Sequence, residues 1–115
     1  MQHSDCIFCQ IIRGEAPATM LYQDERAVAF RDIAPIAPVH VLIVPRLHIA
    51  SAAEVTAEHA PLIGHLIAIA AHIARQQGIA ERGYRLVTNV GREGGQVIFH
   101  LHWHLIGGRQ LRGIG

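Results

Sequence analysis

Three histidines alternate with large apolar residues late in the chain, where residues 99–105 read Phe-His-Leu-His-Trp-His-Leu. In an extended strand, side chains two positions apart share a face, so His100, His102 and His104 form one row and the apolar residues line the other face. A helix would scatter the same side chains by about 100° per residue. Imidazoles are poor packing material, because each carries polar atoms that need partners when buried. Three in register therefore predict a catalytic site or a metal site.

The three histidines could together bind a transition metal ion. Two imidazoles two residues apart on a strand can bind the same ion, and all three histidines would then hold an open catalytic metal that activates water. No convincing carboxylate accompanies the row in the sequence. A chelator separates this interpretation from a histidine nucleophile, because only the metal enzyme loses its activity.

A glycine-rich segment at 91–96 comes directly before the row. Successive glycines let backbone N–H groups approach an anion closely. We expect the flanking strands to form a hairpin, which would bring Asn89, Gly94 and Gly95 close to the start of the histidine row. A flexible hairpin turn is the alternative, but donors for a phosphate beside three imidazoles make a phosphate site the better interpretation.

The elements that must position these residues follow from the apolar pattern. The sequence predicts a short helix or turn over 6–13, closed by Gly14, strands at 20–23, 27–31, 40–44, 84–89 and 97–106, and a proline-containing loop at 32–38. One long helix is expected over 58–77, beginning near Thr56 or Glu58 and ending at Gly78. Strands on both sides of a single helix indicate an α+β fold, an antiparallel sheet with the helix on one face.

The long helix carries an apolar stripe wider than one sheet face would cover, which predicts that part of it faces a partner subunit. The stripe and its flanks comprise Leu62, Ile63, Leu66, Ile67, Ile69, Ala70, Ile73 and Ala74.

Length and composition bound the possibilities. With 115 residues, half of them hydrophobic, the chain is expected to form a single domain over 1–115. The formal net charge is +1, and the ten positively charged side chains are all arginines that form no long basic run, which argues against a nucleic-acid binder. The apolar run at 62–74 contains two histidines and is too short for a bilayer of about 30 Å, so no membrane partner is expected. The amino terminus lacks the regions of a signal peptide, which predicts a cytoplasmic protein.

The row and its surroundings resemble the histidine triad superfamily, whose signature is three histidines alternating with hydrophobic residues. Similar segments extend over nearly the whole chain, at 6–12, 29–33, 37–40, 45–49, 94–96 and 107–109. The glycine pair after the row is similar to the histidine triad nucleotide-binding proteins, rather than to the dinucleoside polyphosphate hydrolases. The resemblance implies a five-stranded antiparallel sheet with one long helix and a short amino-terminal helix, paired into a homodimer.

The resemblance also implies hydrolysis at the α-phosphorus of a purine nucleoside phosphoramidate, with no cofactor needed for catalysis. His102 would attack phosphorus and form a nucleotidyl-histidine, which is chemically reasonable because a neutral imidazole is plentiful near pH 7. His104 would bind phosphate and help to protonate the leaving group, and His100 would orient the nucleophile. A nucleotide-sensing protein with incidental hydrolysis is an alternative within the same family.

Further residues of the expected nucleotide site come from the same resemblance. Asp32 would accept hydrogen bonds from the ribose, and Asn89 and Gly95 would donate to phosphate. The remaining members are Gln96 and His40, with Ile7, Phe8, Ile11, Phe30 and Ile33 enclosing the base. Ordinary core packing is the alternative for each apolar residue taken singly. Val97 stands where some relatives carry a serine that touches phosphate, so one donor is absent here.

Cys6 and Cys9 raise a separate question. A Cys-x-x-Cys pair is either a redox pair or half of a zinc site, and a closed tetrahedral site needs two further ligands. The resemblance to bacterial members of the family implies His48 and His100 in that role. Zinc would then tether the amino-terminal segment to the sheet, whereas thiols that pack as small hydrophobes are the alternative.

Overall fold

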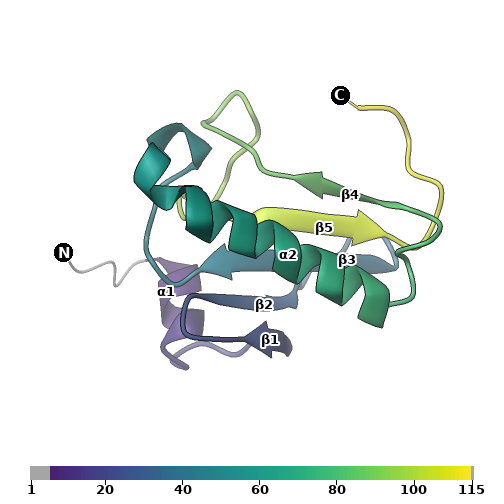
Figure 1. Cartoon of the computed structure of the whole chain (residues 1–115), viewed down its shortest axis with the longest axis horizontal. Coiled ribbons are helices and arrows are strands. Elements are labelled where there is room, and N and C mark those ends of the chain that lie inside the picture. Colours follow the sequence, from purple (N-terminus) through teal and green to yellow (C-terminus); the bar gives the residue numbers. More distant parts are fainter. Residues whose placement is uncertain (1–5, 115) are drawn as a thin grey trace.

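A five-stranded antiparallel sheet forms the centre of the molecule in the computed structural model, which describes residues 6–114 (Figure 1). The elements are α1 (Ile7–Ile12), β1 (Met20–Gln23), β2 (Ala27–Arg31), β3 (Val39–Pro45), α2 (Ala60–Gln76), β4 (Tyr84–Val87) and β5 (Trp103–Gly107), with short 3-10 turns at Ala52–Glu54 and Ala57–His59. The expected α+β class is confirmed. The stretch on which we based the absence of a signal peptide lies largely outside the described residues.

The sheet has the order β1-β2-β3-β5-β4, so β3 lies at its centre and is buried along its whole length. Alternation along the strands divides the core in two. Side chains such as Ala29, Ile43 and Leu105 pack with α2 on one face, whereas Phe30 and Leu42 pack with α1 on the other face. The register pairs Leu42 with His104, which places His104 on the α1 face.

Helix α2 has the predicted extent apart from its first turn. A 3-10 turn at Ala57–His59 precedes it, Pro61 lies in its first turn where a missing N–H costs nothing, and Gly78 follows it at φ +76°. Leu66 and Ile73 are buried against the sheet, but Ile67 stays 37% exposed. The helix therefore leaves part of its apolar surface uncovered, as its wide stripe predicted.

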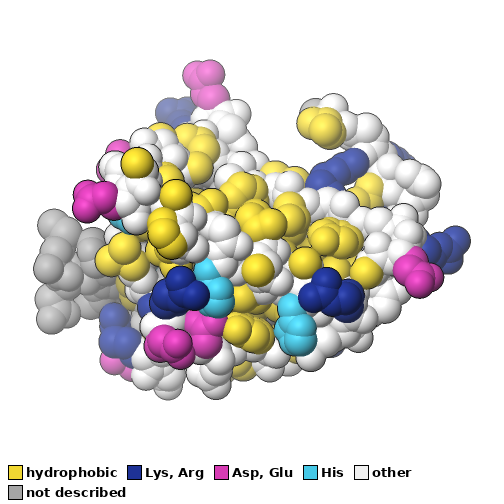
Figure 2. Space-filling view, viewed as in Figure 1, with side chains coloured by type: hydrophobic (Ala, Val, Ile, Leu, Met, Phe, Trp, Pro, Cys, Tyr) yellow, Lys and Arg dark blue, Asp and Glu magenta, His cyan; other side chains and the backbone are white. Residues whose placement is uncertain are grey.

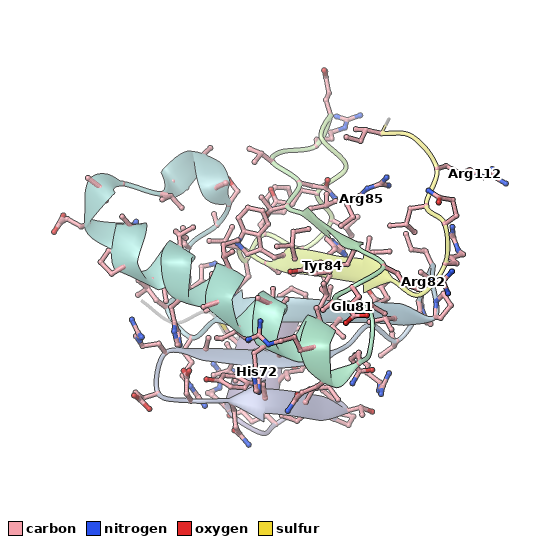
Figure 3. The ribbon with its side chains drawn as sticks, turned by 45° about the vertical axis from the view of Figure 1, so that its right-hand side comes forward. His72, Glu81, Arg82, Tyr84, Arg85 and Arg112 are labelled. Atoms are coloured by element: carbon pink, nitrogen blue, oxygen red, sulfur yellow. The ribbon has the colours of Figure 1, made fainter. Side chains whose placement is uncertain are left out.

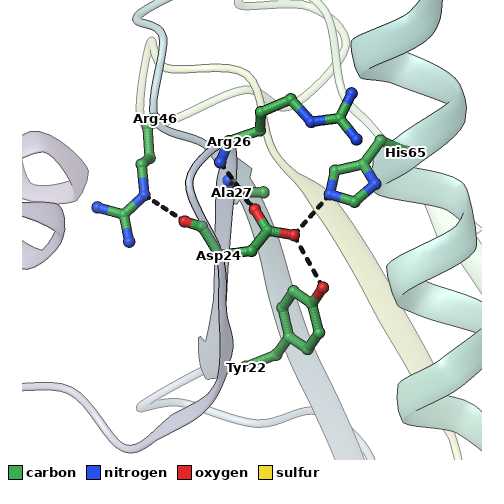
Figure 4. Close-up of polar contacts among 6 residues, drawn as sticks. All are labelled: Tyr22, Asp24, Arg26, Ala27, Arg46 and His65. Atoms are coloured by element: carbon green, nitrogen blue, oxygen red, sulfur yellow. Dashed lines mark hydrogen bonds and ion pairs between the residues drawn. The ribbon is translucent and has the colours of Figure 1, made fainter.

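The turn between β1 and β2 fastens α2 to the sheet through Asp24 (Figure 4). Its carboxylate accepts hydrogen bonds from the backbone N–H groups of Arg26 and Ala27, at 2.7 and 2.9 Å. The Tyr22 hydroxyl donates to the same carboxylate at 2.8 Å, and Nε2 of His65 on α2 lies 2.6 Å from it. One side chain thus joins the turn, the strand and the helix.

Two of the predicted strands are wrong in extent. β4 spans Tyr84–Val87 instead of 84–89, and β5 spans Trp103–Gly107 instead of 97–106. The chain before β5 bends at 98–100 and stays outside the sheet ladder, and the Leu101 N–H donates to the Ile49 carbonyl at 2.6 Å. Phe99, expected on the packing face, is 52% exposed for the same reason.

Among residues 6–114, no helix combines the length and apolar character that crossing a bilayer would require.

Candidate functional site

The three histidines of the row line the α1 face of the sheet. Phe8 of α1 contacts two of them edge-on, with ring centroids 5.9 Å from His100 and 4.9 Å from His102. The His102 and His104 rings are 4.9 Å apart. The predicted alternation therefore holds for the direction of the side chains, although only His104 belongs to β5.

His102 has its proton placed by the backbone. Its Nδ1 lies 2.7 Å from the His100 carbonyl oxygen, which only accepts, so Nδ1 carries the hydrogen and Nε2 keeps its lone pair. Burial lowers the pKa of His102, although this hydrogen bond and the charge of Asp32 act in the opposite direction. The Thr88 hydroxyl donates to the His102 carbonyl at 2.7 Å and holds the backbone in place. The ring is a neutral imidazole with a free nucleophilic nitrogen.

His104 has the opposite tautomer, and a neighbouring loop sets it. The Ile36 N–H donates to Nδ1 of His40 at 3.2 Å, so the proton of His40 lies on Nε2. That Nε2 donates to Nδ1 of His104 at 2.9 Å. The proton of His104 is consequently on Nε2, the nitrogen that this relay leaves free to donate. His102 and His104 therefore offer a lone pair and a proton side by side.

Burial lowers the pKa values of both relay histidines. It is the main cause for His40, where the charge of Asp32 opposes it from 3.4 Å. Burial lowers the pKa of His104 to about 4, and repulsion from His102 and His40 adds to the effect. Both rings are thus neutral near pH 7, which is the protonation state that the relay requires.

His100 belongs to a different cluster, which consists of Cys6, Cys9, His48 and His100. Its Nε2 donates to the Pro45 carbonyl at 2.8 Å, which leaves the lone pair of Nδ1 directed toward the two thiols. Nδ1 lies 3.3 Å from the sulfur of Cys6 and 3.5 Å from that of Cys9. In tetrahedral zinc sites the sulfur and nitrogen ligands stand about 3.6 Å apart. The residues that we expected to bind zinc do lie together, and their donor atoms fit a metal.

The row does not converge on one metal ion. His100 lies with the thiols, His104 lies with Asp32 and His40, and His102 belongs to neither cluster of potential ligands. In the second cluster the facing nitrogens of His40 and His104 lie 2.9 Å apart, which is a hydrogen-bond distance, so these two rings are already partnered with each other. The geometry therefore does not support the catalytic-metal interpretation.

The glycine-rich segment lies close to Asn89, as the sequence predicted. Gly95 has φ +87°, and a Cβ built on it would lie 4.0 Å from the Asn89 side-chain nitrogen. The side chain of Gln96 is buried and fully engaged: it accepts from the Gly91 N–H and donates to the Ala50 carbonyl at 2.8 Å. Gln96 thus holds the loop together, and its amide is not directed at a ligand.

The residues expected around the base differ in what they can contact. Phe8 and Phe30 are buried and pack edge-to-face at 5.6 Å, so they form core. Ile11 is half-buried against them. Ile7 is 41% exposed and Ile33 is 95% exposed, which leaves both side chains available to a ligand.

Sequence reasoning missed the residues that act through their backbone or from the edge of the site. Thr88, Pro45 and Ile36 hold the histidines through single hydrogen bonds. Only the two prolines around Ile36 signalled an ordered loop there.

Comparison with known proteins shows the family and the fold of the chain. Residues 13–111 match the HIT domain family. The purine nucleoside phosphoramidase of Escherichia coli (strain K12) is 51% identical over 107 residues, which cover 93% of this chain and 90% of that protein. Among solved structures, a HIT family hydrolase from Clostridium thermocellum has a TM-score of 0.95 at 46% identity, covering 98% of each chain. A histidine triad nucleotide-binding protein from Candida albicans has a TM-score of 0.79 at 29% identity, covering 96% of this chain and 85% of that one.

Proposed function

Because this chain belongs to the HIT domain family, we propose that it hydrolyses purine nucleoside phosphoramidates, the activity for which its Escherichia coli relative is named. The observation that carries the proposal is the pair of opposite tautomers at His102 and His104. A lone pair and an N–H donor side by side suit a displacement at phosphorus, in which one bond forms as another breaks.

In the first step, Nε2 of His102 bonds to the α-phosphorus and the phosphorus–nitrogen bond breaks. The leaving amine takes up the proton from Nε2 of His104, and because Nδ1 of that ring carries no hydrogen, His104 is left as an imidazolate anion. The nucleotidylated His102 ring is a cation, since Nδ1 keeps its hydrogen on the His100 carbonyl. That charge forms 4.9 Å from the His104 ring and favours loss of the His104 proton.

In the second step, water attacks phosphorus, gives a proton back to Nε2 of His104, and the bond to His102 breaks. The products are a nucleoside monophosphate and the regenerated imidazoles. Two smaller barriers replace one large one. We place the ribose at Asp32 and the phosphate at Asn89 and Gly95, whose N–H groups would stabilise the charge on the phosphoryl oxygens.

We further propose that the Cys6, Cys9, His48 and His100 cluster holds a structural zinc ion. Burial first, and then the neighbouring Cys6 thiol, raise the pKa of Cys9 to about 11, so a thiolate at this position needs a cation beside it. A metal here would tie α1 to the sheet. Reduced thiols also fit a cytoplasmic location.

A homodimer built on β4 completes the proposal. β4 ends the sheet, so the outer edge of this strand presents unpaired backbone groups. The opposite edge, β1, has a shifted register that makes it a poorer template. Apolar side chains gather between α2 and β4 (Figure 2), among them Ile63, Ile67 and Leu86. A second copy pairing antiparallel with β4 would extend the sheet and cover this patch, as two-fold symmetry allows.

The test is the hydrolysis of an adenosine 5′-phosphoramidate by the wild type and by His102→Ala, each with and without a chelator. We expect His102→Ala to lose at least about 1,000-fold in kcat, and His59→Ala, which changes a histidine outside the site, to keep the wild-type rate. The chelator should leave turnover intact. Substantial activity in His102→Ala would rule out this nucleophile, and loss of wild-type activity on chelation would favour a metal-dependent mechanism.

A further inference from the structure

The loop that sets the His40 tautomer has no fully buried residue, and its own hydrogen bonds, from the Ala34 N–H to Asp32 and from the Asp32 N–H to the His40 carbonyl, do not involve Ile36. Residues 32–38 form neither helix nor strand, and the Ile36 side chain is 62% exposed. Its backbone N–H nevertheless donates to His40 at 3.2 Å, which decides where the protons of both relay histidines lie. Something outside the loop must therefore keep Ile36 in position.

The segment after β5 supplies that support. Nη2 of Arg109 donates to the Ile36 carbonyl at 2.9 Å, and Nη1 donates to the Gln110 carbonyl at 3.0 Å. Gly108 has φ +97°, and a Cβ at this position would meet Cβ of Pro38 at 2.9 Å. The residue preceding Arg109 thus touches the same loop so closely that only glycine fits. Two independent contacts join this segment to the loop at 32–38.

We propose that Arg109 is a positioning residue for the proton donor His104, acting through Ile36 and His40. This inference rests on the proposed function. Without the Arg109 hydrogen bond, the Ile36 N–H is no longer held against Nδ1 of His40, and part of the population can carry its proton on Nδ1, although the Asp32 carboxylate 3.4 Å from Nε2 still favours the original tautomer. Nε2 of His40 then accepts from His104, the His104 proton moves to Nδ1, and Nε2 loses the hydrogen that the leaving group needs.

Leaving-group chemistry separates this role from a merely structural one. An amine must take up a proton to depart, whereas p-nitrophenolate departs as an anion. For Arg109→Ala we expect about a tenfold loss in kcat on an adenosine 5′-phosphoramidate and less than about a twofold loss on adenosine 5′-(p-nitrophenyl phosphate). Equal losses on the two substrates, or no loss on either, would overturn the proposal.

Two rescue experiments follow from the surroundings of Arg109. Lysine can donate to the Ile36 carbonyl, so Arg109→Lys should recover part of the kcat on the phosphoramidate. The Arg109 hydrogen bond lies at the surface and Ile36 is 62% exposed, so millimolar guanidinium should reach the Ile36 carbonyl and restore part of the activity of Arg109→Ala.

Arg112→Ala is the matched control. Arg112 lies on the same segment and carries the same charge, its side chain points away from the sheet (Figure 3), and its contact with Arg85 is made by its backbone carbonyl at 2.6 Å. The control should keep the wild-type kcat on both substrates. A loss in Arg112→Ala equal to that in Arg109→Ala would trace the effect to the charge of the segment and not to the hydrogen bond.

A spectroscopic measurement tests the relay without turnover. The ¹⁵N shifts of His104 distinguish a ring protonated on Nε2 from one protonated on Nδ1. We expect the Nε2–H form in the wild type and a mixture of forms in Arg109→Ala, whereas an unchanged His104 tautomer would overturn the proposal. If the wild type hydrolysed neither substrate, the proposed function would fail, and this measurement would still decide the relay.

Discussion

His102 and His104 differ in their chemistry because different atoms face Nδ1 of each ring. At His102 that atom is a backbone carbonyl oxygen, which requires a hydrogen on Nδ1. At His104 it is the Nε2–H of His40, which forbids one. The rings stand 4.9 Å apart and present opposite functions. Spacing in the sequence predicted the row, but only the contacts of each ring distinguish the nucleophile from the donor.

The protonation of His104 gives a pH prediction. Burial, followed by repulsion from His102 and His40, lowers the pKa of His104 to about 4, so the ring should stay neutral through the range in which an ordinary histidine titrates. Because the unfolded chain binds this proton near pH 6.5 and the folded chain does not, this group reduces stability as pH falls from about 6.5 toward 4.

The measurement is a proton NMR titration of the His104 ring. Its midpoint should lie below about pH 5 in the native protein and near 6.5 in urea, where the chain is unfolded. A native midpoint near 6.5 would contradict the burial argument, and with it the assignment of His104 as a neutral hydrogen-bond donor.

At the scale of elements, the Asp24 turn is the strongest polar link between the helix and the sheet. Burial alone would raise the pKa of Asp24, but hydrogen bonds from Arg26, Tyr22, His65 and Ala27 together lower it well below its usual range. A depressed carboxyl pKa contributes stability that is present above the unfolded pKa of about 3.9 and is lost as pH falls below it.

Asp24→Asn should therefore reduce the free energy of unfolding by about 1.5–3 kcal/mol at pH 7, as measured by urea unfolding. The difference from the wild type should shrink when the titration is repeated at pH 3. Glu25→Gln is the control, since it removes a neighbouring exposed carboxylate and should change stability by less than about 0.5 kcal/mol. An Asp24→Asn effect that does not depend on pH would show that charge contributes little to the link.

Helix α1 has six residues and depends on its contacts with the sheet. If zinc binds the cysteine and histidine cluster at a hundred times Kd, it stabilises the fold by about 3 kcal/mol, and its removal should lower Tm by about 10 °C. The wild type should contain one zinc per chain by elemental analysis, and Cys9→Ser should contain none. A chelator should lower Tm in the wild type alone. An equal shift in Cys9→Ser would place the chelator effect elsewhere.

Regular elements were predictable because one periodicity covers each of them. The strands at 20–23 and 27–31 and the long helix follow from apolar patterning and from Gly78. Residues 99–105 alternate strictly, but the strand begins only at Trp103, and the backbone before it bonds to Ile49 and Thr88 in place of a neighbouring strand. Patterning reports which way side chains face and does not report what the backbone bonds to.

The same limit applies to the candidate site. Side chains with distinctive chemistry, such as His40 and His48, were found from the sequence, and the structure brings them to the expected neighbours. Gln96 was expected at the nucleotide, but its amide bonds to the backbone of its own loop. The sequence did not identify Ile36, because its role depends on a single backbone N–H group that donates to His40. Backbone hydrogen bonds arise only once the chain has folded.

At the scale of the whole molecule, the two flanks of α2 differ. On the flank toward β1, His65 reaches Asp24 at 2.6 Å, and the His72 ring meets Tyr22 edge-on with ring centroids 6.1 Å apart, so both side chains are engaged with the β1–β2 hairpin. The other flank, toward the end of the sheet that β4 forms, carries Ile67, which is 37% exposed. This asymmetry is why we place the second copy on the β4 side.

Ile67→Glu should therefore convert the dimer into a monomer, because a carboxylate buried in an apolar interface lacks a partner and costs several kcal/mol. Sedimentation velocity would follow the change, with circular dichroism confirming that the fold is kept. Ala68→Glu introduces the same charge one residue later, on the flank of α2 that faces β1, and should remain dimeric. A wild type that sediments as a monomer, or an Ala68→Glu variant that dissociates as readily as Ile67→Glu, would remove the β4 interface from consideration.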